Sequence, residues 1–181
     1  LRNNCHYIDI GGYGILRDLL KPYEKSIEAQ KLCFIIGVGW MPGISGVFSK
    51  TIIETHLNSP ENTNFNIYYG AVDNWSYSST YDLAASSMGK TRSYVYSHGK
   101  EIQVSPFRYT HHKFFPFIGH KKICMPSFDE QLTQLATSLK QIRKISTFIM
   151  LNDYISMGKF MFIKIFYKHN LNKATLMLQD D

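Results

Sequence analysis

The stretch that decides the fold runs from residue 7 to residue 54 and reads YIDIGGYGILRDLLKPYEKSIEAQKLCFIIGVGWMPGISGVFSKTIIE. Its first four residues form a short apolar run that ends in glycine, which predicts a buried strand and a tight turn. A second apolar run, 32–36, leads into another glycine-rich turn, and residues 47–56 are amphipathic. The order strand, turn, helix, strand, turn, helix is typical of a parallel sheet covered on both faces.

A helix should connect the two strands, because apolar residues recur there every three or four positions. They are Ile15, Leu16, Leu19, Leu20, Tyr23 and Ile27. Pro22 interrupts this pattern and costs about 3 kcal/mol in a helix interior, so the helix either kinks there or restarts. Since the amphipathic pattern continues beyond Pro22, a kink is favoured.

The pattern changes after residues 58–64, a polar stretch that contains proline and reads as a linker. Strand-like runs follow at 65–69, 93–96 and 101–104, and His98 with Gly99 should turn the last two into an antiparallel hairpin. Residues 129–142 predict a helix, with Ser127 as its N-cap and Glu130 completing a capping box. Residues 147–151 are strand-like, whereas 157–167 fit either a helix or a strand.

The predicted fold class is therefore α/β. Residues 1–57 are interpreted as the C-terminal part of a Rossmann-like parallel sheet, and residues 64–181 as an α+β domain with a largely antiparallel or mixed sheet.

The composition is that of a folded globular chain of 181 residues with a net charge of +6 and three cysteines. No apolar run approaches the roughly 18 residues of a membrane helix, so no membrane partner is expected. The cysteines form no CxxC pair, which favours a reducing, cytoplasmic setting. The chain begins at Leu1 without a signal sequence, and we interpret it as starting within a longer protein. The basic residues are spread along the chain, which makes nucleic-acid binding an unfavoured reading.

The turn from Gly37 to Gly43 has the spacing of a phosphate-binding loop between a strand and a helix. However, no GxGxxG motif is complete, either there or at Gly11, Gly12 and Gly14. The acidic residue that would hold the ribose would have to fall in the linker. A tight turn with Pro42 at the first helical position is therefore the preferred interpretation.

The same residues resemble the later strands of the saccharopine dehydrogenase family's cofactor domain, which has a G-x-x-x-PG-[LIV]-[ST] turn. Gly39, Pro42, Gly43, Ile44 and Ser45 match this turn. Looser similarity continues through NWSYSSTYDLA (74–84), YVYSHGKEIQV (94–104) and FFPFIGHKKICMPSFDEQLTQLA (114–136). Gln30 replaces a usual glycine, and Met41 stands where saccharopine reductase-like members have an acidic residue.

The resemblance implies an oxidoreductase that uses NAD or NADP and acts on a small-molecule substrate at a carbon bonded to nitrogen. The main phosphate-binding fingerprint would lie before Leu1, and a homodimer is expected. The turns at the carboxyl ends of the strands would line the nicotinamide end of the cleft. The cofactor-binding residues would be Gly11, Gly12, Tyr13, Gly39, Met41, Pro42, Gly43 and Ser45. The opposite, substrate-binding wall would be Trp75, Ser76 and Tyr77, although a core tryptophan with surface neighbours is equally compatible.

Other candidate residues give weaker evidence of a function. Asp9, Asp73 and Asp82 each have a structural explanation, so no general base is named. No recognised metal-ligand spacing joins the candidate ligands His111, His112, His120 and Cys124. Between Arg108 and Lys122, lysines 113, 121 and 122 lie among phenylalanines 114, 115 and 117, an arrangement that could bind single-stranded nucleic acid. The two faces of a strand, with aromatic residues inward and lysines outward, explain it better. The alternative to an enzyme is a scaffold or interaction module of the same fold.

Overall fold

The computed structural model describes residues 3–10, 13–39, 43–57, 63–70, 76–88, 93–127, 130–138, 142–151, 154–167 and 170–179. The chain forms two compact units. The first comprises Leu1–Asn58 and Asp129–Leu135, and the second comprises Ser59–Phe128 and Ala136–Asp181. The first unit thus takes in residues 129–135, which the sequence assigns to the second domain.

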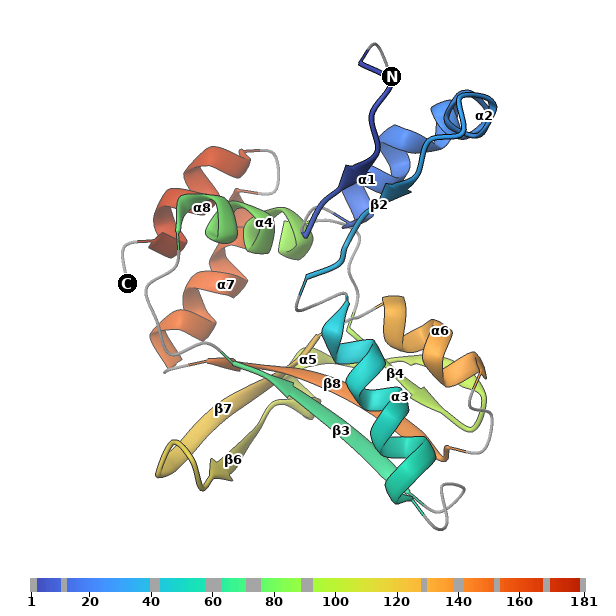
Figure 1. Cartoon of the computed structure of the whole chain (residues 1–181). Helices are drawn as coiled ribbons and strands as arrows, with labels where there is room; N and C mark the ends of the chain where they lie inside the picture. Colours follow the sequence, from blue (N-terminus) through green and yellow to red (C-terminus); the bar gives the residue numbers. More distant parts are fainter. Residues whose placement is uncertain are drawn as a thin grey trace. The chain divides into compact units, whose positions relative to one another are not determined.

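The first unit contains the predicted order of strand, helix, strand and helix (Figure 1). Strand β1 (Tyr7–Ile8) pairs in parallel with β2 (Phe34–Ile35), with Tyr7 opposite Phe34. The connection consists of α1 (Tyr13–Leu20), the 3₁₀ helix η1 (Lys21–Tyr23) and α2 (Glu24–Ala29), and α3 (Ile44–His56) follows β2. The strand, helix and strand order is confirmed, but the described part of this sheet holds two short strands, so a Rossmann-like sheet remains a prediction.

The favoured prediction, one helix with a kink at Pro22, is wrong, and the alternative of a helical segment that restarts at Pro22 is closer to the structure. Pro22 lies in the first turn of η1, and this 3₁₀ turn separates α1 from α2. A proline is tolerated at the start of a helical segment because its missing N–H has no intrahelical partner there. The expected single apolar face is broken as well, since Ile27 is buried whereas Leu19 and Tyr23 are exposed.

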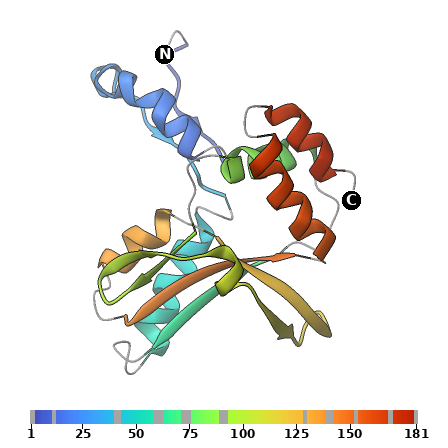
Figure 2. The same ribbon diagram turned by 180° about the vertical axis from the view of Figure 1, so that it is seen from behind.

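The second unit is built on a six-stranded sheet with the order β5-β4-β8-β7-β6 and with β3 also paired to β8 (Figures 1 and 2). β3 runs parallel to β8, and the remaining pairs are antiparallel. The prediction of a largely antiparallel or mixed sheet is confirmed. The strands are β3 (Asn64–Tyr69), β4 (Tyr94–Ser97), β5 (Lys100–Gln103), β6 (His111–Phe115), β7 (His120–Ser127) and β8 (Lys144–Leu151).

The β4–β5 hairpin closes through the predicted two-residue turn. Ser97 pairs with Lys100, and the intervening His98 and Gly99 have φ angles of 49° and 78°. Two residues with positive φ form the turn whose twist matches that of the flanking strands. The hairpin prediction is confirmed.

The predicted N-cap of the helix near residue 130 is wrong. Ser127 is the last residue of β7, where it pairs with Thr147. Its hydroxyl donates to Thr147 Oγ1 at 3.3 Å, and Thr147 Oγ1 donates to the Ser127 carbonyl oxygen at 2.9 Å. The strand therefore uses the side chain that would have capped α6 (Glu130–Ser138).

Helices α7 (Tyr154–Phe166) and α8 (Leu171–Gln179) pack against one face of this sheet, and α4 (Tyr77–Met88) packs against these two helices. A short helix, α5 (Pro106–Tyr109), precedes β6. Met157 of α7 and Leu178 of α8 contact the buried cluster Ile123, Met125 and Leu151. The opposite sheet face carries a second buried cluster formed by Phe115, Cys124 and Phe148, against which Tyr68 packs.

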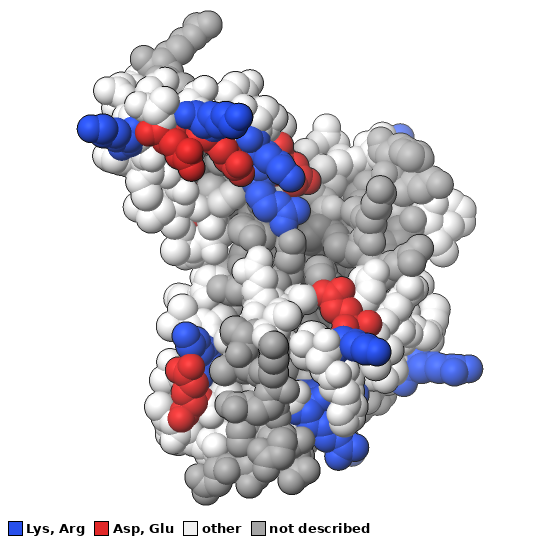
Figure 3. Space-filling model, turned by 90° about the vertical axis from the view of Figure 1, so that its right-hand side faces the viewer, with Lys and Arg blue, Asp and Glu red and all other residues white. Residues whose placement is uncertain are grey.

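No helix within the described ranges is long and apolar enough to cross a membrane. Over α1 and α2, basic and acidic side chains lie side by side (Figure 3). An example is Arg17, whose Nε lies 3.3 Å from Asp18 Oδ1 at a solvent-exposed position. This mixture is that of an ordinary solvated surface.

Candidate functional site

The candidate site is the edge of the first unit where β1 and β2 end. The Asp9 amide donates to the Ile35 carbonyl oxygen at 2.9 Å, and the Val38 amide donates to the Asp9 carbonyl oxygen at 3.1 Å. The chain leaving β2 therefore continues alongside the end of β1. Open parallel sheets bind their ligands at this carboxyl edge of the strands.

Gly39 is pressed against the end of β1. A Cβ atom at Gly39 would lie 2.2 Å from the Ile10 carbonyl oxygen, a distance that real Cβ atoms do not show. A side chain here would push the two turns apart. The glycine is thus required by backbone packing, and it is not by itself a sign of phosphate binding.

Gly43 is required by the start of α3. Its φ and ψ angles are 129° and −107°, and a Cβ atom would lie 2.2 Å from the Gly39 carbonyl oxygen. The same oxygen accepts a hydrogen bond from the Ile44 amide at 2.9 Å, while the Gly46 amide donates to the Gly43 carbonyl oxygen at 3.1 Å. Amides that would hold an anion at a helix N-terminus are therefore already bonded within the turn.

Ser45, in the first turn of α3, is the polar group of the site that lacks a partner. Its Oγ is buried, and it has no hydrogen-bond partner among the residues that the structure describes. Leaving a buried hydroxyl unsatisfied costs about 1–3 kcal/mol, so such a group calls for an explanation, and a bound water, ion or ligand is one kind. A neutral hydrogen-bonding ligand group is the chemistry that Ser45 fits.

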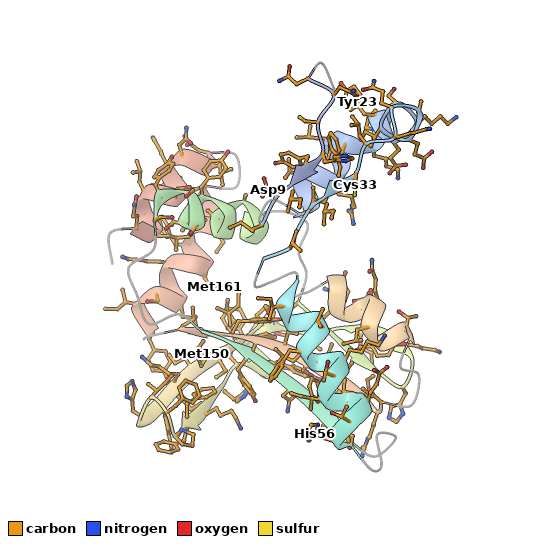
Figure 4. The ribbon with its side chains drawn as sticks, viewed as in Figure 1. Asp9, Tyr23, Cys33, His56, Met150 and Met161 are labelled. Atoms are coloured by element: carbon orange, nitrogen blue, oxygen red, sulfur yellow. The ribbon has the colours of Figure 1, made fainter. Side chains whose placement is uncertain are left out.

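Asp9, labelled in Figure 4, carries a carboxylate next to the end of β1. The Tyr7 hydroxyl donates a hydrogen bond to Asp9 Oδ2. This hydrogen bond, with smaller contributions from desolvation and from the carboxylate charge, raises the pKa of Tyr7. The pair can therefore hold a proton at the Tyr7 hydroxyl. Sequence reasoning missed Tyr7, although residues two apart in a strand point to the same face.

The structure brings together three of the predicted cofactor residues, namely Gly39, Gly43 and Ser45, on the turn after β2 and the first turn of α3. Tyr13 is the first residue of α1. The other predicted residues of this group, and one of the predicted substrate residues, lie outside the described ranges: Gly11, Gly12, Met41, Pro42 and Trp75.

Ser76 and Tyr77, predicted to contact the substrate, have structural roles in the second unit. Ser76 precedes α4, and its Oγ accepts a hydrogen bond from the Ser79 amide at 3.2 Å, as an N-cap does. The Tyr77 hydroxyl donates to Asn172 Oδ1 of α8 at 3.4 Å. These contacts tie α4 to its neighbour and favour the structural alternative for both residues.

The basic and aromatic stretch forms α5 and the β6–β7 hairpin. Phe115 is buried, as expected for an inward aromatic residue of a strand, but Phe114 and Phe117 are 53% and 80% exposed. The expectation that these aromatic residues all face inward is therefore wrong for Phe114 and Phe117. Lys113 lies with its Nζ 5.2 Å from the centroid of the Tyr68 ring.

The histidines of β6 take part in hydrogen bonds with tyrosines. His111 Nδ1 lies 3.0 Å from the Tyr109 carbonyl oxygen, which can only accept, so in the neutral ring Nε2 accepts from the Tyr68 hydroxyl at 3.3 Å. His112 Nε2 lies 3.0 Å from the Tyr154 hydroxyl. Within the described ranges, no group of three or more His, Cys, Asp or Glu side chains could hold a metal ion.

Comparison with known proteins adds no assignment to this geometry. No protein-family model matches the chain, and no curated protein sequence matches it.

Proposed function

We propose that this chain is part of a cytoplasmic NAD(P)-dependent oxidoreductase of saccharopine dehydrogenase type, acting on a small substrate at a C–N or related centre. The turns after β1 and β2 would line the nicotinamide end of the cofactor. The observation that supports this proposal is the buried Ser45 hydroxyl, which has no partner in the described structure and lies in the first turn of the helix that follows a parallel strand.

The turn fits the nicotinamide end of a dinucleotide better than it fits the pyrophosphate. The amides of Ile44 and Gly46 already donate to carbonyl oxygens of the turn, so pyrophosphate would find few free donors there. A nicotinamide ribose or carboxamide is uncharged and can exchange hydrogen bonds with one hydroxyl group. Ser45 would hold that group, and the bound cofactor would supply the hydride acceptor or donor.

The exposed face of the β1–β2 sheet supports the proposal that these two strands belong to a larger parallel sheet. Ile8, Ile10 and Ile35 are 68%, 75% and 43% exposed, and alternation puts Ile8 and Ile10 on one face of β1. Parallel sheets ordinarily have both faces covered by helices. A two-stranded sheet is also only marginally stable alone. Further strands and helices of a cofactor domain would cover these side chains.

The test is calorimetric titration of the chain with NADH and with NADPH. Replacing Ser45 with alanine removes one hydrogen bond to the ligand, so we expect affinity to fall about five- to tenfold. Ser146 provides the matched control, because its Oγ on β8 is also buried and without a partner in the described structure. Ser146→Ala should bind the cofactor as the parent does.

Two outcomes would contradict this proposal. One is equal loss of affinity in both serine variants, which would show a general effect of removing a buried hydroxyl. The other is an absence of binding by the parent chain and by a longer chain that supplies the missing strands. This second result would favour the alternative of a non-catalytic scaffold or interaction module of the same fold.

A further inference from the structure

The β6–β7 hairpin, at one end of the sheet order, carries an aromatic ring that the core does not cover (Figure 1). Phe117, in the turn of the hairpin, is 80% exposed. Its ring centroid lies 5.8 Å from that of the buried Phe115, and the Phe115 centroid lies 5.4 Å from that of Tyr68. The three rings therefore form a row that begins in the core of the second unit and ends in solvent.

Strand pairing places basic side chains on the same face of the hairpin as this row. Lys113 lies directly opposite Lys122, and Phe115 lies directly opposite His120. Residues that pair directly point to the same face of a sheet, and every second residue of a strand returns to that face. We call this group the hairpin face; its members are Lys113, Phe117, His120 and Lys122.

The pairing of Lys113 with Lys122 does not serve the stability of the hairpin. Like charges directly opposite one another in a sheet are destabilising, whereas a carboxylate opposite a lysine would be favourable. Lys113 Nζ lies 5.2 Å from the centroid of the Tyr68 ring, so this ammonium group stays beside the aromatic row. An anion bound next to both lysines would remove the repulsion between them.

The chain segment that forms the hairpin contains no acidic residue to supply that anion. The nearest acidic residues in the sequence are Glu101 and Asp129. Glu101 lies on β5, at the opposite end of the sheet order from β6. Asp129 comes after Ser127, which ends β7 about 23 Å from the hairpin turn at 3.3 Å per residue. Asp153, which follows β8, lies outside the described ranges.

The kind of apolar side chain that is exposed here indicates the kind of anion. Between residues 104 and 127 the large apolar side chains at exposed positions are all phenylalanines, namely Phe107, Phe114 and Phe117. Aliphatic side chains of the same segment point inward, since Ile123 and Met125 are 4% and 7% exposed. An exposed ring beside lysines is the combination that binds single-stranded nucleic acid, because an unpaired base stacks on the ring while a phosphate contacts the cation.

We propose that the hairpin face binds single-stranded nucleic acid, with a base stacked on Phe117 and the phosphates beside it held by Lys113 and Lys122. The sequence disfavours this partner, because its basic residues are spread along the chain and its aromatic residues are expected to point inward. The register of the two strands brings the lysines together, and Phe117 is exposed at the turn.

The test is fluorescence anisotropy of labelled oligo-dT and oligo-U of about 12 nucleotides with the full chain, over a range of salt concentrations. We expect binding to these single strands at low salt, weaker binding to a duplex of equal length, and release by added salt. Phe117→Ala should lower affinity about five- to 150-fold, the effect of losing one stacked base. Its melting temperature should stay near that of the parent, since the ring is 80% exposed.

Lys113→Gln should weaken binding and reduce the slope of log affinity against log salt by about 0.7, because one phosphate contact is lost. The matched controls are Phe114→Ala and Lys121→Gln. Phe114 and Lys121 lie directly opposite each other on the other face of the same hairpin, and Phe114 is 53% exposed. Both control variants should bind with the affinity and the salt dependence of the parent.

Four outcomes would overturn the proposal. The first is a parent chain that binds neither oligonucleotide at low salt, and the second is equally tight binding of the duplex. The third is a loss of affinity in Phe114→Ala as large as in Phe117→Ala, which would show that the hairpin face is not the surface used. The fourth is competition by AMP as strong as that by the unlabelled oligonucleotide, because the site would then take a single nucleotide.

Discussion

Gly39→Ala tests the close approach of the turns after β1 and β2. The added Cβ atom would lie 2.2 Å from the Ile10 carbonyl oxygen, which is a backbone atom and cannot rotate away. A relaxed contact needs a separation of about 3.5 Å, so one of the two turns must move by about 1 Å. Forced overpacking of this kind typically costs about 1–3 kcal/mol. We expect Gly39→Ala to fall in the upper part of that range.

Alanine substitutions at two other glycines are controls that distinguish this clash from the other effects of adding a methyl group. Gly119 has a φ of 79° with open space around it, so Gly119→Ala should show the backbone strain alone, about 1–2 kcal/mol. Gly158 lies inside α7, also with open space around it. Gly158→Ala should therefore stabilise the protein by about 0.5–1 kcal/mol through helix propensity.

Amide hydrogen exchange is the assay for Gly39→Ala, because it reports on the turns locally. The amides of Asp9 and Val38 form hydrogen bonds between the two chain segments, and the Ile44 amide donates to Gly39 itself. A loss of 1–3 kcal/mol corresponds to roughly five- to 150-fold faster exchange at these amides. Thermal unfolding measures the two control variants. Unchanged exchange in Gly39→Ala, or destabilisation by Gly158→Ala, would refute this reasoning.

Two further predictions concern titration and reactivity. Asp9→Asn should bring the pKa of Tyr7 down towards its ordinary value, as followed by the NMR shift of the ring carbon that bears the hydroxyl; an unchanged titration would contradict the hydrogen bond. Because folding raises the pKa of Tyr7, its hydrogen bond to Asp9 stabilises the folded state fully below the unfolded pKa of about 10. This stabilisation is lost as the pH rises through the pKa of Tyr7 in the folded state. With a thiol reagent, the exposed Cys5 and Cys33 should react quickly, whereas Cys124 should react only on unfolding, because it is 0% exposed and burial raises its pKa. Rapid reaction of all three thiols in the native chain would contradict the buried position of Cys124.

Local signals in the sequence were sufficient where backbone conformation decides the structure. The turn at His98 and Gly99 requires two residues with positive φ, and a glycine after a residue that tolerates this region is a direct sign of such a turn. The glycines at 39 and 43 likewise marked the turn between β2 and α3. Their spacing did not reveal why glycine is needed at these two positions. A side chain at Gly39 would meet the Ile10 carbonyl oxygen, and one at Gly43 would meet the Gly39 carbonyl oxygen.

Tertiary contacts decided the features that the sequence did not predict. Helix α4 has no apolar periodicity, because Thr80 and Ala84 are among the small residues that face the core. Ser127 has the residue type and spacing of an N-cap, but strand pairing with Thr147 takes it into β7. Whether Ser45 has a hydrogen-bond partner also depends on its neighbours in space, so the sequence could name the residue without showing that its hydroxyl is left unpaired in the described structure.

The position of β8 in the sheet has a consequence for synthesis on the ribosome. β8 pairs with β3 along one edge and with β4 and β7 along the other, and it is the last of these strands to be made. Until residues 144–151 have left the exit tunnel, β3 has no partner and the hairpins have no central strand to join. The nascent chain therefore exposes unpaired strand edges for most of its synthesis, and chaperones that cover such edges should bind it before β8 emerges.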